Sequence, residues 1–505
     1  MRSLVAGVRP AWLAVCGLLP ALAGCTVGPD FVPPTPPTAR SYEKNGLPAA
    51  TAQSEGSKGV AQRFSLAADL PGEWWRLYRS PALDQLIRQA LADNPDLQAA
   101  DAALRQAQEL TAVQASGLWP TVGVSAGRER ERISGAAEGY PALSQLYNLS
   151  NASVAVSYSP DLFGGVRRAI EAAEAQADYQ RWQREAAILS LTANIVTTAI
   201  QEASLRAQIK ATEDIIAAEA EQLRVIEAQF ALGGAARTDI LAQQSLLAQS
   251  RATLPGLQQQ LEAQRHLLAA YQGHGPDQGA DAEFELDNLT LPEDLPVTLP
   301  ARLVEQRPDI QAATANLHAA SAEIGVAIAN QWPQLTLSGS YGTAANQFGQ
   351  LYSPNAAAWS IGASIAQPIF QGGALEHRRD AAQAAFDQAR AQYRSAVLGA
   401  LRNVADSLRA LQSDAESLLQ QQAFARTATD SLALSKQRYA AGAISHLALL
   451  DAQRSEAQAR LGLIQAQAAR LADCAALFQS LGGGWWNRPE RAVPPLLSTE
   501  MRVHD

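Results

Sequence analysis

The sequence predicts a mixed α/β membrane protein, in which very long helices are combined with short strands that cross the membrane. The run from Val166 to Leu232 contains no glycine or proline and is dominated by good helix formers. As one helix it would be about 100 Å long, too long for an ordinary globular core. A second run, from Ala374 to Ala441, differs mainly in Gly399. Before each run lie two segments in which apolar and small polar residues alternate, as in strands.

A seven-residue rhythm marks the second half of the first run. A heptad repeat of apolar residues predicts a seam that packs against neighbouring helices in a coiled coil. Its members are Ile209, Ile216, Leu223 and Phe230, with Leu205 and Ile226 beside them.

Composition excludes several classes of protein. The 505 residues carry a net charge of −9, which argues against nucleic-acid binding. The six histidines and three cysteines show no metal-ligand or catalytic spacing, so we expect no metal, no cofactor and no enzymatic activity. No apolar run after residue 24 is long enough for a membrane-spanning helix. Any membrane crossing must therefore use strands.

The N-terminus has the features of a lipoprotein signal. Residues 1–24 place two arginines before an apolar segment that ends in Leu22-Ala23-Gly24-Cys25. This ending resembles the bacterial lipobox, which implies cleavage before Cys25 and attachment of fatty acids such as palmitate to that cysteine. Thr26, where an aspartate would favour the inner membrane, indicates the outer membrane. The proline-rich stretch that follows predicts an extended tether.

The chain contains an internal duplication. Asn94-Pro95-Asp96 returns as Arg307-Pro308-Asp309, and Trp119-Pro120 returns as Trp332-Pro333, both at an offset of 213 residues. Each half is predicted to run helix, strand, strand, long helix, helix. The predicted parts are a signal peptide (1–24), a lipidated tether (25–63), a first repeat (64–271), a connector (272–306), a second repeat (307–481) and a C-terminal segment (482–505).

Each of the four alternating segments has one apolar and one small polar face, as expected of strands between lipid and water. Two half-buried hairpins of a soluble sheet are the alternative. Four strands cannot close a membrane barrel, so several subunits must share one, and a symmetric homo-oligomer follows. The apolar positions are Val122, Val124 and Ala126; Val154, Val156 and Tyr158; Leu335, Leu337 and Tyr341; and Trp359, Ile361, Ala363 and Ile365.

Several motifs together resemble the TolC-like outer-membrane efflux proteins, in the lipoprotein branch that works with RND-type pumps. The resemblance implies a homotrimer with a twelve-stranded outer-membrane β-barrel, four strands per chain, continued by a long periplasmic α-helical barrel. It also implies a small mixed equatorial domain, which we assign to residues 64–82, 272–306 and 482–498. The motifs are Cys25-Thr26-Val27-Gly28-Pro29-Asp30, the segment from Trp74-Trp75 to Ile87, the two Pro-Asp/Trp-Pro repeats, and Leu481-Gly482-Gly483-Gly484-Trp485.

The function implied by this resemblance is the exit duct of a tripartite efflux pump. The duct would passively export drugs or other small toxic compounds, together with a periplasmic membrane-fusion adaptor and an inner-membrane RND pump. One alternative is the outer-membrane duct of a type I protein secretion system. A non-channel periplasmic coiled-coil lipoprotein is another.

Two sets of residues are candidate functional positions. Gly233 and Gly442 follow the two long helices, where each chain segment must reverse, and are expected to form the hairpin tips that receive the adaptor. By spacing alone, Leu447 would pack the hairpin and Asp451 would be a solvated helix residue. The resemblance instead implies that Leu447 and Asp451 form the periplasmic gate, although Ala448 departs from relatives that carry a second aspartate there.

Overall fold

The computed structural model describes residues 26–39, 41–43, 46–66, 68–134, 145–278 and 282–488. Signal residues 1–24, Cys25 and the C-terminal residues from 489 onward lie outside the described residues. The chain divides into two compact units. The first contains the described parts of Met1–Pro34, Ala103–Gln180 and Ala313–Tyr393, and the second those of Thr35–Ala102, Arg181–Ala312 and Arg394–Asp505.

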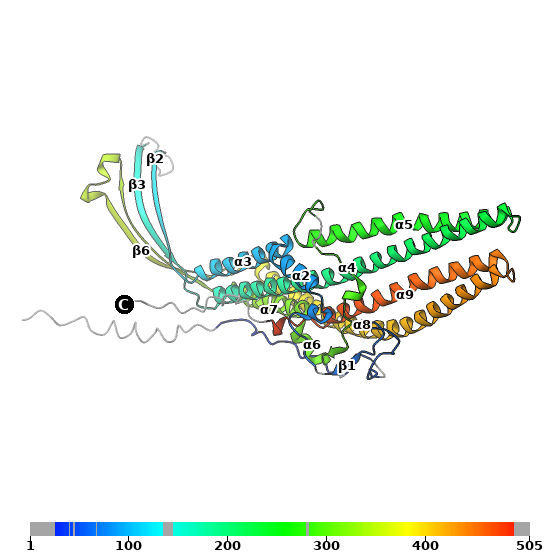
Figure 1. Ribbon diagram of the computed structural model, residues 1–505. Helices are drawn as coiled ribbons and strands as arrows, with labels where there is room; N and C mark the ends of the chain where they lie inside the picture. The colour runs from blue at the N-terminus through cyan, green and yellow to red at the C-terminus, as the bar shows by residue number, and fades with distance from the viewer. Residues whose placement is uncertain are drawn as a thin grey trace, which may run out of the picture. The chain divides into compact units, whose positions relative to one another are not determined.

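The two halves of the chain have the same elements in the same order (Figure 1). In both halves the three helices contain 22, 67 and 35 residues. The predicted order of elements is thereby confirmed. The first half contains α3 (Pro95–Ser116), β2 (Thr121–Ile133), β3 (Gln145–Tyr158), α4 (Gly165–Ala231) and α5 (Arg237–Tyr271). The second contains α7 (Pro308–Ala329), β5 (Gln334–Ala345), β6 (Ala357–Ala366), α8 (Ala374–Ala440) and α9 (His446–Ser480).

The strands of both halves form one antiparallel sheet in the order β2-β3-β5-β6. Its register aligns the predicted faces across all four strands. One row joins Val124 to Val154, Tyr341 and Trp359, while the neighbouring residues Ser125 and Ser153 share a hydrogen bond on the opposite face, with 2.9 Å between their Oγ atoms. The apolar and polar positions predicted from the alternation therefore form two continuous faces, since side chains alternate along every strand.

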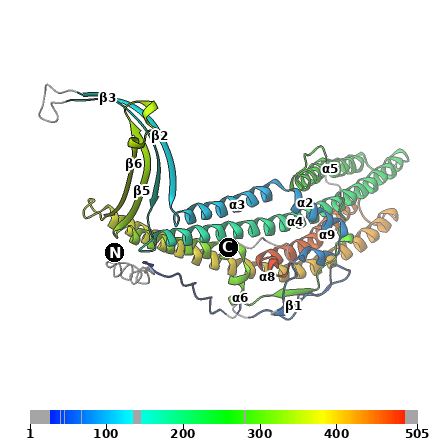
Figure 2. The ribbon, with the colours of Figure 1, turned by 90° about the vertical axis from the view of Figure 1, so that its left-hand side faces the viewer.

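Within the second unit, α4 runs alongside α5 and α8 alongside α9 (Figures 1 and 2). The heptad seam predicted on α4 is placed differently in the structure. Ile209, Ile216 and Leu223 are half-buried and Phe230 is 44% exposed. The stripe buried within one chain contains Leu205, Ile215 and Ile226, interleaved with the polar residues Gln208, Thr212 and Glu219. A repeat fixes the period of a seam, but the neighbouring helices decide which residues it buries.

The described parts of the segments assigned to the equatorial domain lie together in the second unit. There β1 (Arg63–Leu66) pairs in parallel with β4 (Asp294–Val297), and α6 (Pro300–Gln306) follows β4. The Nε1 atom of Trp485 donates to the carbonyl oxygen of Gln306 at 2.7 Å, and Trp486 Nε1 donates to Asp69 Oδ1 at 2.8 Å.

Short 3-10 helices lie at Trp74–Tyr78, Leu286–Asn288, Phe348–Gln350, Pro354–Ala356 and Trp485–Asn487.

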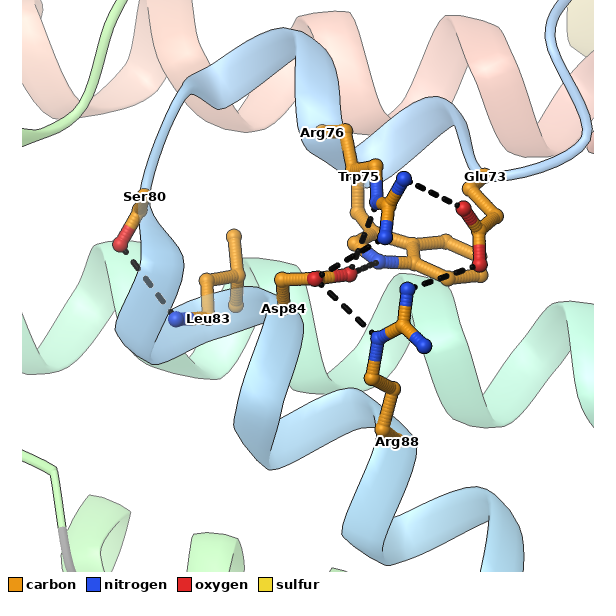
Figure 3. A network of polar contacts seen from close by, with 7 residues as sticks. All are labelled: Glu73, Trp75, Arg76, Ser80, Leu83, Asp84 and Arg88. Atoms are coloured by element: carbon orange, nitrogen blue, oxygen red, sulfur yellow. Dashed lines mark hydrogen bonds and ion pairs between the residues drawn. The ribbon is translucent and has the colours of Figure 1, made fainter.

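A network of charged side chains fixes the start of α2 (Pro81–Asp93) (Figure 3). The Asp84 carboxylate accepts hydrogen bonds from Trp75 Nε1 at 3.0 Å and from the guanidinium groups of Arg76 and Arg88, both at 3.1 Å. Partial burial acts to raise the pKa of Asp84, but these donors outweigh it and hold that pKa below its usual value. Trp74 and Trp75 are 1% and 4% exposed, so this pair anchors the core.

Arg470 of α9 ties the N-terminal segment to the helices of the second unit. Its side chain is fully buried and donates hydrogen bonds to the carbonyl oxygens of Lys58 (2.6 Å) and Val60 (2.7 Å) and to Thr51 Oγ1 (3.0 Å). A buried guanidinium is stable only where acceptors replace its lost water. This part of the predicted extended tether is fixed in place and folds back on itself, since the Thr51 N–H donates to the carbonyl oxygen of Gln62 at 2.9 Å and Ala50 pairs with Arg63.

Asp473 of α9 and Asp414 of α8 form a carboxyl pair. Burial, followed by the charge and the hydrogen bond of Asp414, raises the pKa of Asp473 to about 7. Asp473 therefore keeps a proton that it shares with Asp414 below neutral pH.

Among the described residues, no helix is both long and apolar enough to span a lipid bilayer.

Because of the proton held by Asp473 and Asp414, the free energy of unfolding should fall as the pH rises. Because the folded-state pKa of Asp473 lies above that of the unfolded chain, the folded state binds more protons between the ordinary aspartate range and about pH 7. The melting temperature of the purified protein should drop from pH 5.5 to pH 8.5, and Asp473→Asn should reduce that drop. Asp414→Asn should reduce it too, since it removes the charge that opposes ionisation. An equal drop in the wild type and both variants would contradict the assignment.

Candidate functional site

The two helical hairpins end in turns that require glycine. Gly442 has φ +70°, and the following Ala443 N–H donates to the carbonyl oxygen of Arg438 at 2.8 Å. Gly233 has φ +79° in the equivalent turn after α4. A Cβ atom at either position would have open space around it. The positive φ, rather than crowding, therefore explains both glycines, and the predicted reversal at these positions is confirmed.

Leu447 and Asp451 lie on the first turns of α9, just after the Gly442 turn. Ser445 caps this helix by accepting a hydrogen bond from the N–H of Ala448 at 3.3 Å. Leu447 is 64% exposed and Asp451 is also exposed, whereas Leu449 is fully buried. Residues four apart share a helix face, so Leu447 and Asp451 present an apolar and an acidic group side by side. Packing within the hairpin accounts for Leu449 but leaves Leu447 without such a role in one chain.

The tips of the two hairpins are joined by residues that the sequence did not single out. Tyr439 at the end of α8 donates its hydroxyl hydrogen to Gln229 Oε1 of α4 at 3.2 Å. Its ring lies 5.6 Å, centroid to centroid, from that of His446, which is buried. Burial lowers the pKa of His446, so the imidazole is neutral at neutral pH. The internal duplication gave one indication of this contact. Tyr439 is the second-half equivalent of Phe230, and its additional hydroxyl group makes the hydrogen bond to Gln229.

The residues that follow Cys25 are held at the base of the strands. Within the first unit, Val27 N–H donates to the carbonyl oxygen of Phe163 at 3.1 Å, shortly after β3 ends. The buried Arg168 of α4 donates to Val27 O at 3.1 Å and forms an ion pair with Asp30 at 2.8 Å. Phe31 stacks on His318, with ring centroids 4.4 Å apart. Cys25 itself lies outside the described residues, but its neighbours are fixed beside the sheet.

The described residues were also considered as possible metal ligands and nucleophiles. Among the residues that the structure describes, no group of three or more His, Cys, Asp or Glu side chains could hold a metal ion. The described Cys474 is buried and free, and burial raises the pKa of its thiol to about 12. A thiol with so high a pKa stays protonated and is a weak nucleophile.

Comparison with known proteins decides the family. The model of the outer membrane efflux protein family matches residues 86–274 and 299–483. The chain belongs to this family. Pyoverdine export outer membrane protein OpmQ of Pseudomonas putida is 31% identical over 487 residues, covering 94% of this chain and 98% of the relative. OpmQ of Pseudomonas aeruginosa is 32% identical over 418 residues, covering 82% of this chain and 87% of the relative.

Solved structures agree with this family. The structure of the outer-membrane channel OprN has a TM-score of 0.81 and 28% identity, and the match covers 91% of this chain and all of that one. The fold class predicted from the sequence is confirmed: this is the fold of trimeric outer-membrane efflux channels with a helical barrel. The outer-membrane location with a periplasmic extension, and the role as an exit duct of efflux systems, are confirmed as well. The family and the matching structures are channels.

Proposed function

We propose that this outer membrane efflux protein is the passive duct of a tripartite RND-type pump and exports small molecules without catalysing a reaction. The observation that supports this most is the combination, in one chain, of a sheet with continuous apolar and polar faces and two 67-residue helices. The duct carries compounds supplied by an inner-membrane pump through a periplasmic adaptor. The names of relatives, pyoverdine export protein OpmQ and toluene efflux protein TtgC, favour small organic compounds as cargo.

A deletion strain tests this function. Accumulation of a panel containing an aromatic solvent, hydrophobic antibiotics and a siderophore should rise for at least one class when the gene is removed, and the wild-type gene should restore export. A type I secretion duct would be favoured instead if the deletion strain accumulated every compound to the wild-type level but no longer secreted a polypeptide that the wild type secretes.

We keep the division predicted from the sequence as a proposal for how the parts work. Its parts are the lipidated tether 25–63, the repeats 64–271 and 307–481, the connector 272–306 and the C-terminal segment 482–505. The lipid anchor at Cys25 belongs to this proposal. Its support is the placement of Val27 beside Phe163, shortly after β3 ends, because fatty acids two residues away would enter the membrane near the strands.

Cys25→Ala should abolish incorporation of labelled palmitate while leaving part of the assembled protein in the outer membrane. A single acylated residue adds only part of the membrane affinity when strands also hold the protein there. Labelling measured on the immunoprecipitated protein checks the first expectation, and trimer yield in the membrane fraction checks the second. Palmitate retained by the variant would refute lipidation at Cys25.

We also propose that the tips at Gly233 and Gly442 receive the adaptor. Gly442→Val should reduce export several-fold without reducing trimer yield, since a β-branched residue at φ +70° must distort the exposed turn. Gly442→Asn should export nearly as well as the wild type, because asparagine tolerates this conformation. Gly399→Val, at a position of α8 with open space around it, is the matched control. Normal drug resistance in Gly442→Val at normal expression would argue against a docking role.

A further inference from the structure

The distal end of β2 carries alternating charges that the function described so far does not use. The segment runs Arg128-Glu129-Arg130-Glu131-Arg132. Because side chains alternate along a strand, the three arginines lie on the same face as Val122, Val124 and Ala126. The two glutamates lie on the opposite face, with Ser125. One hairpin thus separates positive charge onto the apolar side of the sheet and negative charge onto its polar side.

The neighbouring strand leaves these arginines free of counter-charges. On β3 they lie opposite Ser150, Asn148 and Leu146, none of which is charged. All three arginines are exposed, and in the part of the chain that the structure describes none of them forms an ion pair. On the other face Glu131 does have a partner, since Tyr147 donates its hydroxyl hydrogen to Glu131 Oε2 at 2.6 Å.

The arginines lie beyond a pair of exposed aromatic residues, on the side of the strands away from the helices. Tyr341 and Trp359 lie opposite each other on the apolar face, 64% and 71% exposed. Exposed aromatic rings on the lipid side of a barrel gather at the edges of the apolar band. The row of Arg128, Ser150 and Ala345 lies four residues farther along the strands, toward the strand ends away from the helices. Residues 145–149 of β3 pair with β2 alone in the described sheet, so β5 does not extend alongside Arg130 and Arg132.

We propose that Arg128, Arg130 and Arg132 form a basic face that binds the phosphate groups of anionic lipids in the outward-facing leaflet. A guanidinium group matches phosphate geometry with two parallel hydrogen bonds. Alternate residues of a strand are about 7 Å apart, so three such groups reach several headgroups along the barrel wall. The chain as a whole has a net charge of −9, so this basic face is opposite in sign to the protein's overall charge. The inference rests on the membrane placement of the strands and is independent of the exported compound.

The test measures lipid binding by the purified trimer in a neutral detergent. The probes are a fluorescent bisphosphorylated lipid A and the same lipid with its phosphates removed. The wild type should bind the phosphorylated lipid at least about tenfold more tightly than the other, and added salt should weaken that binding. Arg128→Gln/Arg130→Gln/Arg132→Gln should lose this preference, whereas replacing the same three residues by lysine should keep most of it.

Two controls separate this face from general charge. Glu129→Gln/Glu131→Gln changes the opposite face of the same strand and should leave binding intact. Arg105→Gln/Arg251→Gln/Arg378→Gln removes the same charge from exposed helical positions and should also leave it intact. Equal binding of the two lipids by the wild type, or unchanged binding by the glutamine variant, would overturn the proposal. Displacement of the lipid by millimolar inorganic phosphate would overturn it as well, because the face would then bind soluble anions.

Discussion

Ile361→Arg should prevent most of the protein from assembling as a trimer in the outer membrane. Ile361 is 83% exposed in one chain, and its row on the sheet also contains Val122, Val156 and Gly339. An arginine on the lipid face costs from about 1 kcal/mol near the interface to about 2–4 kcal/mol at mid-bilayer, and a symmetric trimer contains three copies of the substitution. The measurement is the fraction of heat-modifiable trimer in purified outer membranes.

Ser360→Arg is the matched control for this experiment. Ser360 is the preceding residue, faces the other side of the sheet, and shares a 2.8 Å hydrogen bond with Ser340. An arginine there would face water, so the trimer should form at a level close to that of the wild type. If Ile361→Arg and Ser360→Arg reduced assembly equally, the two faces would not mark a boundary between lipid and water.

The second large effect is expected at the proposed gate. Leu447→Ala/Asp451→Ala should raise single-channel conductance several-fold and make cells sensitive to large antibiotics such as vancomycin. We propose that three-fold symmetry brings three exposed leucines and three carboxylates together at the hairpin-tip end of the helical barrel and narrows it there. An apolar ring resists wetting, and charges held close together govern which ions pass. Planar-bilayer recordings of the purified trimer, wild type against variant, measure this directly.

The control comes from the same hairpin. Asp430 and Leu434 of α8 are likewise an aspartate and a leucine four residues apart, and both are exposed. Asp430→Ala/Leu434→Ala should leave conductance near the wild-type value. Leu449 is unsuitable as a control because it is fully buried, and truncating a buried leucine costs about 2–5 kcal/mol of stability. Identical conductance in the wild type and the Leu447/Asp451 variant would place the constriction elsewhere.

Much of this fold could be read from the sequence because it depends on local periodicity. A run of helix formers without proline specifies a helix wherever the chain lies, and α4 begins and ends within one residue of the predicted run. Alternation of small polar and apolar residues specifies the two faces of a strand in the same way. Gly233 and Gly442 could be assigned to turns because a positive φ is a property of single residues.

The candidate site was predicted less completely. Spacing placed Leu447 and Asp451 on one helix face, but only the structure distinguishes the exposed Leu447 from the buried Leu449. The bond from Tyr439 to Gln229 joins residues 210 positions apart in the chain. No local pattern reports which distant residue a side chain will meet.

The sequence by itself determined the two long helices and their lengths, the duplication and the faces of the four paired strands. Only the tertiary structure decided which face of α4 is buried, how Arg168 and Arg470 hold the N-terminal segment, and why Asp473 keeps its proton near neutral pH. The physical reason is that propensity and periodicity act over a few neighbouring residues. Burial, hydrogen bonding of a guanidinium group and the pKa of a carboxyl depend instead on groups that folding brings together from distant parts of the chain.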